Sequence, residues 1–260
     1  MASIERGPWL EAPKSADTDH FITAIGDVHG RADLLEPLLE ALAEDAIEPG
    51  IDRASCIFLG DLIDRGPDVI NALGLAAGGL SMFVGGRLPV EDVLILGNHD
   101  SWLRSALDDR LTADELDLWR INGGAETWAA FGIAALQRPD AIVDGLRQSV
   151  PQFVQDAIHT MVPSHRIGDW AFVHGGLDPR RPLEDQPAEV VCWIRDAFLY
   201  PEEAWPFPVI VVHGHTPEDP FEDPTIARHR INLDTGAFFT GVLTALELRN
   251  DRMRFVQAKG

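Results

Sequence analysis

The sequence predicts an α/β fold in which two stacked mixed β-sheets are flanked by helices. Short, nearly continuous apolar runs recur along the chain, which is typical of strands that are covered on both faces. Segments with leucine at helical spacing follow the early runs, so strands and helices alternate. Aspartate, asparagine, histidine and glycine stand directly after most of the runs, where the chain would leave a sheet.

The first half of the chain repeats a pattern of strand, loop and helix. Each apolar run is followed by a glycine, and the segments between the runs place apolar side chains on one helical face. The predicted strands are Phe21–Ile25, Cys56–Leu59 and Val93–Leu96, and the predicted helices span residues 31–48 and 69–77.

The second half begins with helices and ends in strands. Residues 101–164 carry helical patterns, with Thr112 and Glu115 as a capping box, and we expect these helices to form a cap beside the strand ends. Trp193–Arg195 is predicted to lie on a short helix. The further predicted strands are Ala171–Val173, Val209–Val212, Ile231–Gly236, Gly241–Leu248 and Met253–Gln257, the last three of them expected to be antiparallel.

Length and composition predict a single domain over residues 1–260, since 45% of the residues are hydrophobic and can form a large core. The net charge of −21 disfavours nucleic acid as a partner, because the protein would repel a long polyanion. Cys56 and Cys192 lie in apolar surroundings, which indicates reduced thiols and a cytoplasmic protein. No apolar run approaches the roughly 18 residues that a membrane span needs, so no membrane association is expected. We also expect the protein to be a monomer.

One stretch concentrates ionisable residues at a strand end. Gly60–Asp68 reads G-D-L-I-D-R-G-P-D and follows the predicted strand Cys56–Leu59. It places Asp61, Asp64 and Arg65 between glycines, so that backbone and ligand can approach closely. Alone, this stretch is a suggestive turn.

Other strand ends repeat the design with aspartate, asparagine and histidine. Mixed oxygen and imidazole donors suit manganese, iron or zinc better than a magnesium or calcium cage. Six donors exceed the needs of one ion and fit two ions roughly 3.5–4 Å apart that share a carboxylate. The candidate ligands are Asp27, His29, Asp61, Asn98, His174 and His215.

Taken singly, each of these motifs is more often structural than functional, because aspartate and asparagine favour turns and a lone histidine is often a core residue. Their occurrence together, each after an apolar run, makes the structural interpretation improbable. His213 and His215 alternate, so they should point to opposite sides, and at most one of them should reach the ions.

These motifs resemble the phosphoprotein phosphatase branch of the calcineurin-like metallophosphoesterases over about residues 21–236. The branch includes serine/threonine protein phosphatases and symmetrical bis(5'-nucleosyl)-tetraphosphatases, and its fold has four layers. Trp193–Arg195 and Asn122–Gly124 are similar to elements of bacterial members. The matching motifs are Asp-x-His-Gly at 27–30, Gly-Asp-x-x-Asp-Arg-Gly at 60–66, Gly-Asn-His at 97–99, His-Gly-Gly at 174–176 and Gly-His-Thr at 214–216.

The resemblance implies a role for each matching residue. Asp27 and His29 would hold a first metal, Asp61 would bridge, and Asn98, His174 and His215 would hold a second. His99 would be the general acid, oriented by Asp64, while Arg65 and Arg195 would grip phosphate oxygens.

Two positions depart from the family pattern. Asp100 stands where glutamate commonly follows Gly-Asn-His, and we expect little effect because this residue is not a ligand. Pro217 stands where the wider superfamily often has another histidine, which favours the phosphatase branch. For His213, a hydrogen bond that supports a metal ligand is preferred over an unrelated structural position.

The expected function is hydrolysis of phosphomonoesters by a hydroxide that bridges two metals, in a serine/threonine protein phosphatase. Hydrolysis of a dinucleoside tetraphosphate by the same centre is the alternative, so the partner is a phosphorylated protein or a nucleotide-type phosphate. A catalytically inactive metal- or phosphate-binding module is disfavoured, because every motif position is present. Manganese is the expected activator, with iron, zinc or magnesium as alternatives.

Overall fold

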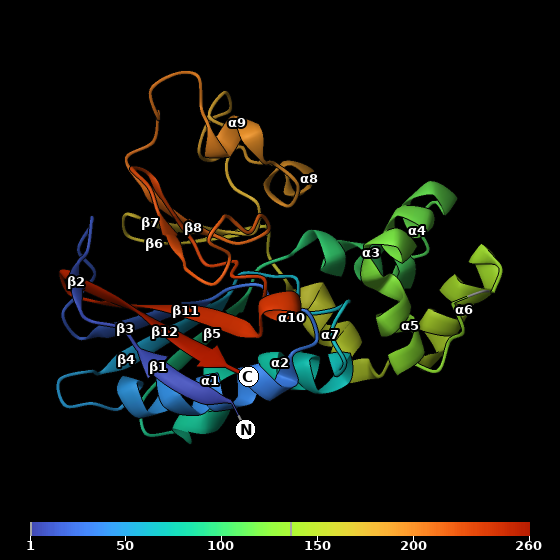
Figure 1. Cartoon of the computed structure of the whole chain (residues 1–260), viewed down its shortest axis with the longest axis horizontal. Coiled ribbons are helices and arrows are strands. Elements are labelled where there is room, and N and C mark those ends of the chain that lie inside the picture. The colour runs from blue at the N-terminus through green and yellow to red at the C-terminus, as the bar shows by residue number, and fades with distance from the viewer. Residues whose placement is uncertain (1, 136) are drawn as a thin grey trace.

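The structure, a computed structural model, describes residues 2–135 and 137–260. A seven-stranded and a five-stranded sheet lie one above the other, with helices outside them (Figure 1). Both sheets are mixed, which confirms the predicted α/β class. None of the helices in the described ranges combines the length and the apolar composition that a membrane crossing requires.

The first sheet has the strand order β1-β12-β11-β3-β4-β5, with β2 paired to β12. Strands β3, β4 and β5 are parallel, and the remaining pairs are antiparallel. The strands are β1 (Ser3–Arg6), β2 (Leu10–Glu11), β3 (His20–Ile25), β4 (Arg53–Phe58), β5 (Val90–Leu94), β11 (Val242–Arg249) and β12 (Arg252–Lys259).

The second sheet has the strand order β6-β7-β8-β10-β9. Strands β7, β8 and β10 are parallel, with an antiparallel strand at each edge. The strands are β6 (Ser164–Ile167), β7 (Trp170–Val173), β8 (Ile210–His213), β9 (Thr225–Ile226) and β10 (Arg230–Asn232).

In the described ranges, all the helices except α10 fall into three groups. Helices α1 and α2 lie on the outer face of the first sheet, α8 and α9 lie beyond the second sheet, and α3 to α7 stand together on one side (Figure 1). The helices are α1 (Ala32–Ala46), α2 (Val69–Val84), α3 (Asn98–Leu107), α4 (Ala113–Trp119), a π-helical turn (Arg120–Gly124), α5 (Ala125–Ala130), α6 (Pro139–Ser149), α7 (Gln152–Thr160), α8 (Ala188–Val191), α9 (Asp196–Leu199) and α10 (Ala237–Thr240).

The apolar core has two parts because the side chains of a strand alternate between its faces. Ile22 and Ala24 of β3 pack between the sheets, against residues such as Phe172 of β7. Phe21 and Ile25 of the same strand belong to the cluster that includes α1. Each sheet is therefore covered on both faces, which explains the continuous apolar runs.

Parallel strands bring their following loops to one edge. The loops after β3, β4 and β5 leave one sheet at their carboxyl ends, and those after β7 and β8 leave the other. These are the five loops that carry the candidate metal ligands.

Two local predictions are wrong. The first concerns Trp193–Arg195, which lie between α8 and α9 and not on a helix. The turn that they form packs closely on Gly175, because a Cβ added to this glycine would lie 3.1 Å from the Ile194 carbonyl oxygen. Strand β10 runs parallel to β8, because the connection from residue 214 to 229 is long enough for a crossover. The antiparallel pairing of β11 with β12 is confirmed.

Candidate metal centre

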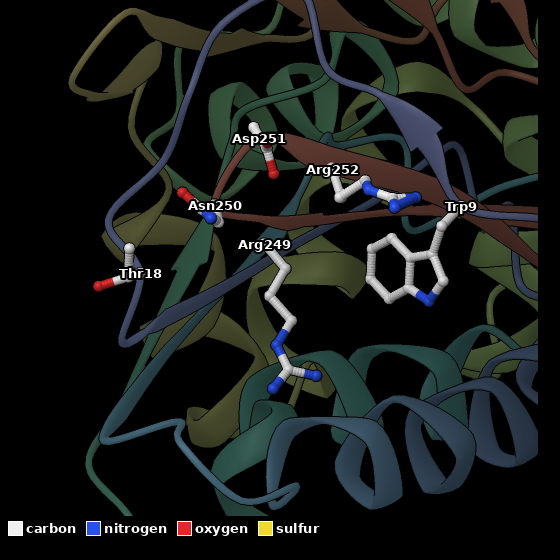
Figure 2. Close-up of a pocket in the computed structure, with 6 residues that line it drawn as sticks. All are labelled: Trp9, Thr18, Arg249, Asn250, Asp251 and Arg252. Atoms are coloured by element: carbon white, nitrogen blue, oxygen red, sulfur yellow. The ribbon is translucent and has the colours of Figure 1, made fainter.

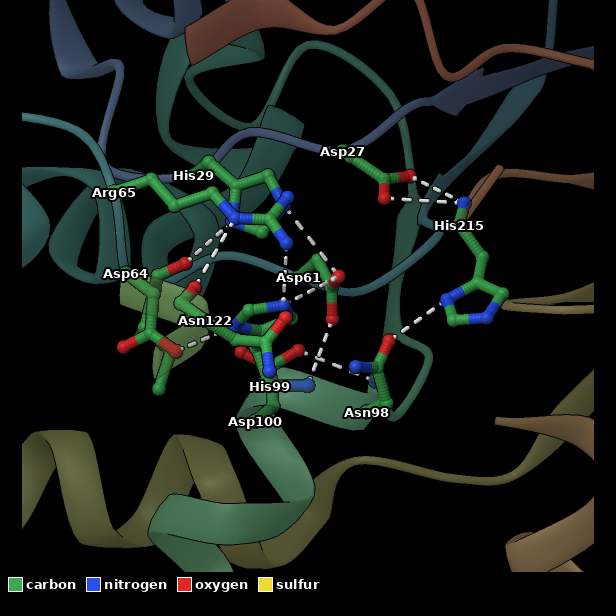
Figure 3. Close-up of polar contacts among 12 residues, drawn as sticks. Asp27, His29, Asp61, Asp64, Arg65, Asn98, His99, Asp100, Asn122 and His215 are labelled. Atoms are coloured by element: carbon green, nitrogen blue, oxygen red, sulfur yellow. Dashed lines mark hydrogen bonds and ion pairs between the residues drawn. The ribbon is translucent and has the colours of Figure 1, made fainter. Parts of the chain in front are cut away.

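Five strand ends bring the predicted ligands together at one carboxylate, that of Asp61. Figure 3 shows Asp27, His29, Asn98 and His215 near it, and His174 lies 3.4 Å from one of its oxygens. The predicted ligand side chains are all buried, and they come from the loops after β3, β4, β5, β7 and β8. The buried ligand residues are Asp27, His29, Asp61, Asn98, His174 and His215.

Asp61 belongs to two groups of side chains that could each hold a cation. In the His29 cluster (His29, Asp61, His99) and the His215 cluster (Asp61, His174, His215), the ligand atoms of each group lie within 4.8 Å of one another. One Asp61 oxygen is 3.5 Å from His29 Nε2, and the other is 3.4 Å from His174 Nε2. Imidazole nitrogens around a shared carboxylate fit a pair of transition-metal ions.

Asp27 and Asn98 are tied to the His215 cluster through hydrogen bonds. The Asp27 carboxylate accepts bonds of 3.1 and 3.2 Å from the backbone N–H of His215. The Asn98 side-chain oxygen accepts bonds from His174 Nε2 at 2.9 Å and His215 Nδ1 at 2.8 Å. With Asp61, all three oxygen ligands expected from the sequence therefore lie at the centre.

The electrostatics of the centre couple the carboxylate to the histidines. Burial opposes the charge on Asp61, but His174 and His99 outweigh burial and hold the pKa of this carboxyl well below its usual range. Burial also opposes a charge on His174, but Asp61 raises the pKa of this imidazole to about 10. Burial lowers the pKa of His215 to about 2, so this imidazole is neutral, the form that binds a metal.

His99 is held in a buried carboxylate network. Its Nδ1 donates to an Asp64 oxygen at 2.5 Å, and Trp119 Nε1 donates to the same oxygen at 2.7 Å. Thr127 donates its hydroxyl to the other Asp64 oxygen. Burial raises the pKa of Asp64, and these three hydrogen bonds oppose part of that rise. The network leaves His99 Nε2 directed toward the metal ligands.

Two arginines reach the centre from different directions. Arg65 donates to His29 Nε2 at 2.8 Å and to His99 Nε2 at 3.0 Å. Arg195 donates to His215 Nε2 at 2.9 Å, although it precedes α9 rather than lying on the helix predicted for it. Each cluster thus has its own guanidinium group.

Backbone strain is concentrated at this centre. Several site residues have a positive φ angle, a conformation that is energetically unfavourable for residues other than glycine. The backbone at Gly214 also lies very close to Asp27, because a Cβ on Gly214 would be 1.9 Å from an Asp27 oxygen. The site residues with positive φ are His29 (44°), Asp61 (49°), Asp64 (71°), Arg65 (65°) and His215 (71°).

The π-helical turn before α5 supports Arg65. The Arg65 backbone N–H donates to the Gly123 carbonyl at 3.1 Å, and its Nε donates to the Asn122 carbonyl at 3.2 Å. Gly123 has a φ of 99°, and a Cβ there would lie 2.6 Å from Arg65 Cγ. Because glycine has no Cβ, residue 123 leaves room for the Arg65 side chain and can adopt the positive φ.

Asp100 and His213 each lie two positions from a proposed ligand but have structural contacts. The Asp100 carboxylate accepts bonds from the backbone of Leu62 and Gly97, and burial raises its pKa to about 7. His213 Nδ1 donates to the carbonyl of Gly214 and its ring packs on Phe198, while His215 turns to the centre. The alternation of the two histidines is confirmed, and His213 supports backbone rather than a ligand side chain.

A family model described as calcineurin-like phosphoesterase matches residues 22–241. The chain belongs to this family. The calcineurin-like phosphoesterases depend on two metal ions, and the histidine–aspartate clusters of this protein lie within the matched region. It is accordingly a hydrolase that acts on phosphoric ester bonds.

Curated relatives of this phosphoesterase are named bis(5'-nucleosyl)-tetraphosphatases. An asymmetrical one from Halalkalibacterium halodurans is 27% identical over 241 residues, which are 85% of this chain and 87% of that protein. A symmetrical one from Methylococcus capsulatus is 28% identical over 158 residues, 61% of this chain and 44% of that protein.

Solved structures share the fold. A protein proposed to be a diadenosine tetraphosphatase matches with a TM-score of 0.59 and 20% identity, over 95% of this chain and 97% of its own. A cold-active protein-tyrosine phosphatase of a Shewanella species matches with a TM-score of 0.58 and 17% identity, over 92% and 80%. A serine/threonine phosphatase of Saccharomyces cerevisiae matches with 0.51 and 14%, over 94% and 81%.

A polar hollow elsewhere on the phosphoesterase does not belong to this centre (Figure 2). It lies at the turn between β11 and β12, and Leu248 of β11 pairs with Ile22 near the start of β3. The metal ligands follow the other end of β3, so the hollow lies at the opposite edge of the sheet. Its lining residues are Trp9, Thr18, Arg249, Asn250, Asp251 and Arg252.

Sequence reasoning missed three side chains of the centre. Trp119 and Thr127 hold Asp64, and Phe238 packs on His29 with ring centroids 5.5 Å apart. Trp119 and Thr127 flank the Asn122–Gly124 element. The similarity of that element to bacterial family members is the feature of the sequence that could have pointed to these two residues.

Metal binding should release a proton from the centre. An imidazole must be neutral to hold a cation, and Asp61 keeps the His174 pKa at about 10, so a cation replaces the His174 proton near pH 7.5. Burial also raises the pKa of the Asp27 carboxyl well above its usual range, so at least one proton is exchanged, and the apparent affinity for Mn²⁺ should rise from pH 6 to 8 by about tenfold per pH unit for each proton released. Calorimetric titrations in buffers of different ionisation enthalpy measure the released proton.

The control for this titration is His159→Gln, since His159 is an exposed histidine on α7. This variant should release the same proton as the wild type. Equal binding heats in all buffers would contradict the assignment of a protonated His174.

Proposed function

We propose that this phosphoesterase hydrolyses dinucleoside polyphosphates at a two-metal centre bridged by Asp61. The observation that carries the proposal is the Asp61 carboxylate, shared by two histidine clusters with an arginine at each. The names of the relatives, which match up to 86% of this chain, support a nucleotide substrate.

The proposed metal sites follow the assignment from the sequence. One would use Asp27, His29 and Asp61, and the other Asp61 with Asn98, His174 and His215. When bound, the cations would supply an acidified water as nucleophile and neutralise phosphate charge. Manganese is the proposed activator, with iron, zinc or magnesium as alternatives.

His99 is proposed to protonate the leaving oxygen. Its Nδ1–H is fixed on Asp64, so Nε2 is the atom that can carry the transferred proton. Nε2 accepts from Arg65 in the structure, so Arg65 must move away before Nε2 can carry that proton.

Arg65 is proposed to leave His29 when a metal ion binds there and to take a substrate phosphate as its new partner. The single lone pair of His29 Nε2 accepts from Arg65, and a cation at His29 needs the same lone pair. Arg65 then becomes available to a phosphate, which its planar guanidinium can grip with two parallel bonds. Arg195, which is exposed beside the His215 cluster, is proposed to act likewise.

A phosphoprotein is the second candidate substrate. The Asp64-Arg65-Gly66 element is typical of a branch that includes serine/threonine protein phosphatases, and the same groups would cleave a phosphomonoester. We further propose that residues 1–260 act as one cytoplasmic, monomeric domain, with helices α3 to α7 as a helical cap beside the strand ends.

The direct test compares substrates on protein loaded with Mn²⁺. The kcat/KM for diadenosine tetraphosphate should exceed that for a phosphothreonine peptide by at least about tenfold, which corresponds to 1.4 kcal/mol. The Asp61→Asn variant serves as the control for contaminating phosphatases and should lose both activities. The reverse ratio would assign the phosphoprotein, and no hydrolysis of either substrate with any divalent cation would refute the proposal.

His99→Ala should lower kcat by roughly 10²–10⁴-fold, because the leaving oxygen loses its acid. The variant should retain its manganese, measured by elemental analysis, since His99 is not a proposed ligand. His159→Ala, which removes an exposed histidine, should behave as wild type. Parallel loss of metal and activity in His99→Ala would show that His99 acts through the metal site.

A further inference from the structure

Three phenylalanines form an exposed ridge beside the metal centre. Phe221 lies in the loop after β8, and Phe238 and Phe239 lie on α10; they are 43%, 38% and 50% exposed. Phe238 and Phe239 meet edge to face with ring centroids 4.9 Å apart, and Phe239 meets Phe221 at 5.5 Å. Contiguous exposed aromatic rings of this kind mark binding surfaces.

The ridge begins at the group proposed to bind phosphate. The guanidinium carbon of Arg65 lies 4.7 Å from the centroid of the Phe238 ring, a cation–π contact. The same ring lies 5.5 Å from the His29 ring. A molecule whose phosphate reaches Arg65 would therefore place its next group against the phenylalanines.

The other half of the centre repeats this pairing. Trp193 is 41% exposed and its ring lies 6.3 Å from that of His215, the residue that accepts from Arg195. Each metal cluster thus has one arginine and one exposed aromatic face. A substrate with an aromatic group at each end of a phosphate chain matches this arrangement.

We propose that the phenylalanine ridge is a base-stacking subsite that holds one nucleobase of the substrate, while its polyphosphate passes Arg65 to the metal centre. Every base has a π face, so stacking on aromatic rings accepts any base. Trp193 provides the corresponding face for the second base. This inference rests on the proposed phosphoesterase function and specifies its substrate class.

A phosphopeptide is the competing occupant. Asp219, Glu222 and Asp223 adjoin Phe221, and such acidic residues would attract a basic peptide. The nucleobase is favoured because the flat rings continue directly from the arginine and because both halves of the centre carry an aromatic face.

The test uses Phe239→Leu, because the Phe239 ring contacts Phe221 and Phe238 rather than a proposed ligand. Wild type and variant, loaded with Mn²⁺, are compared on diadenosine tetraphosphate and on inorganic tetraphosphate, which has no bases. The kcat/KM ratio of the two substrates should fall roughly 5- to 100-fold, mainly through KM for the nucleotide. Phe239→Trp should restore the ratio.

Two further variants complete the test. Phe221→Leu changes the ridge from a different segment and should lower the same ratio, which guards against a folding defect in α10. Phe153→Leu, at a 46% exposed phenylalanine of α7, should keep the wild-type ratio.

Distinct outcomes separate the two proposals. An unchanged ratio in both ridge variants, or a larger loss on a phosphothreonine peptide than on the nucleotide, would overturn the base-stacking subsite. A wild type that hydrolyses neither substrate would refute the proposed function instead. The subsite would then be tested by calorimetry, which compares the binding of AMP and of ribose 5-phosphate to wild type and to Phe239→Leu. The variant should bind AMP more weakly than wild type does, and equal AMP affinity in the two proteins would contradict the subsite.

Discussion

The attraction between the buried Asp61 carboxylate and the histidines around it is the interaction on which the rest of the centre depends. Burying a carboxylate is costly unless positive or hydrogen-bonding groups compensate it. His174 supplies the charge, and the backbone N–H of His99 donates to Asp61 at 3.0 Å. Asp61 follows β4, His99 follows β5 and His174 follows β7. The free-energy cost of burying Asp61 is therefore offset only when these three strand ends meet, so the centre assembles as the sheets fold.

The double sheet makes this meeting possible. Its parallel strands end along one edge, and two covered faces hold the strands rigidly enough to impose positive φ on residues such as Asp61 and Arg65. The strand ends approach so closely that a Cβ on Gly60 would lie 2.5 Å from the Gly97 nitrogen. Strain and close approach thus set the direction in which each polar side chain points.

The sequence predicted the two sheets and all ten residues proposed for the centre, because each of those residues follows an apolar run or belongs to a recognisable motif. It did not predict the contacts of Asp64 with Trp119 and Thr127, because these residues lie on helices more than fifty positions away and follow no period. The turn at Arg195 and the parallel direction of β10 were also missed. Both depend on packing between distant segments rather than on local pattern.

The most direct test of the account is anomalous X-ray diffraction from crystals soaked in Mn²⁺, which locates each ion relative to Asp61. A shared Asp61 carboxylate predicts two peaks roughly 3.5–4 Å apart, each within coordination distance of an Asp61 oxygen, one beside His29 and the other beside His174 and His215. A single peak, or two peaks of which either lies out of reach of Asp61, would contradict the shared carboxylate.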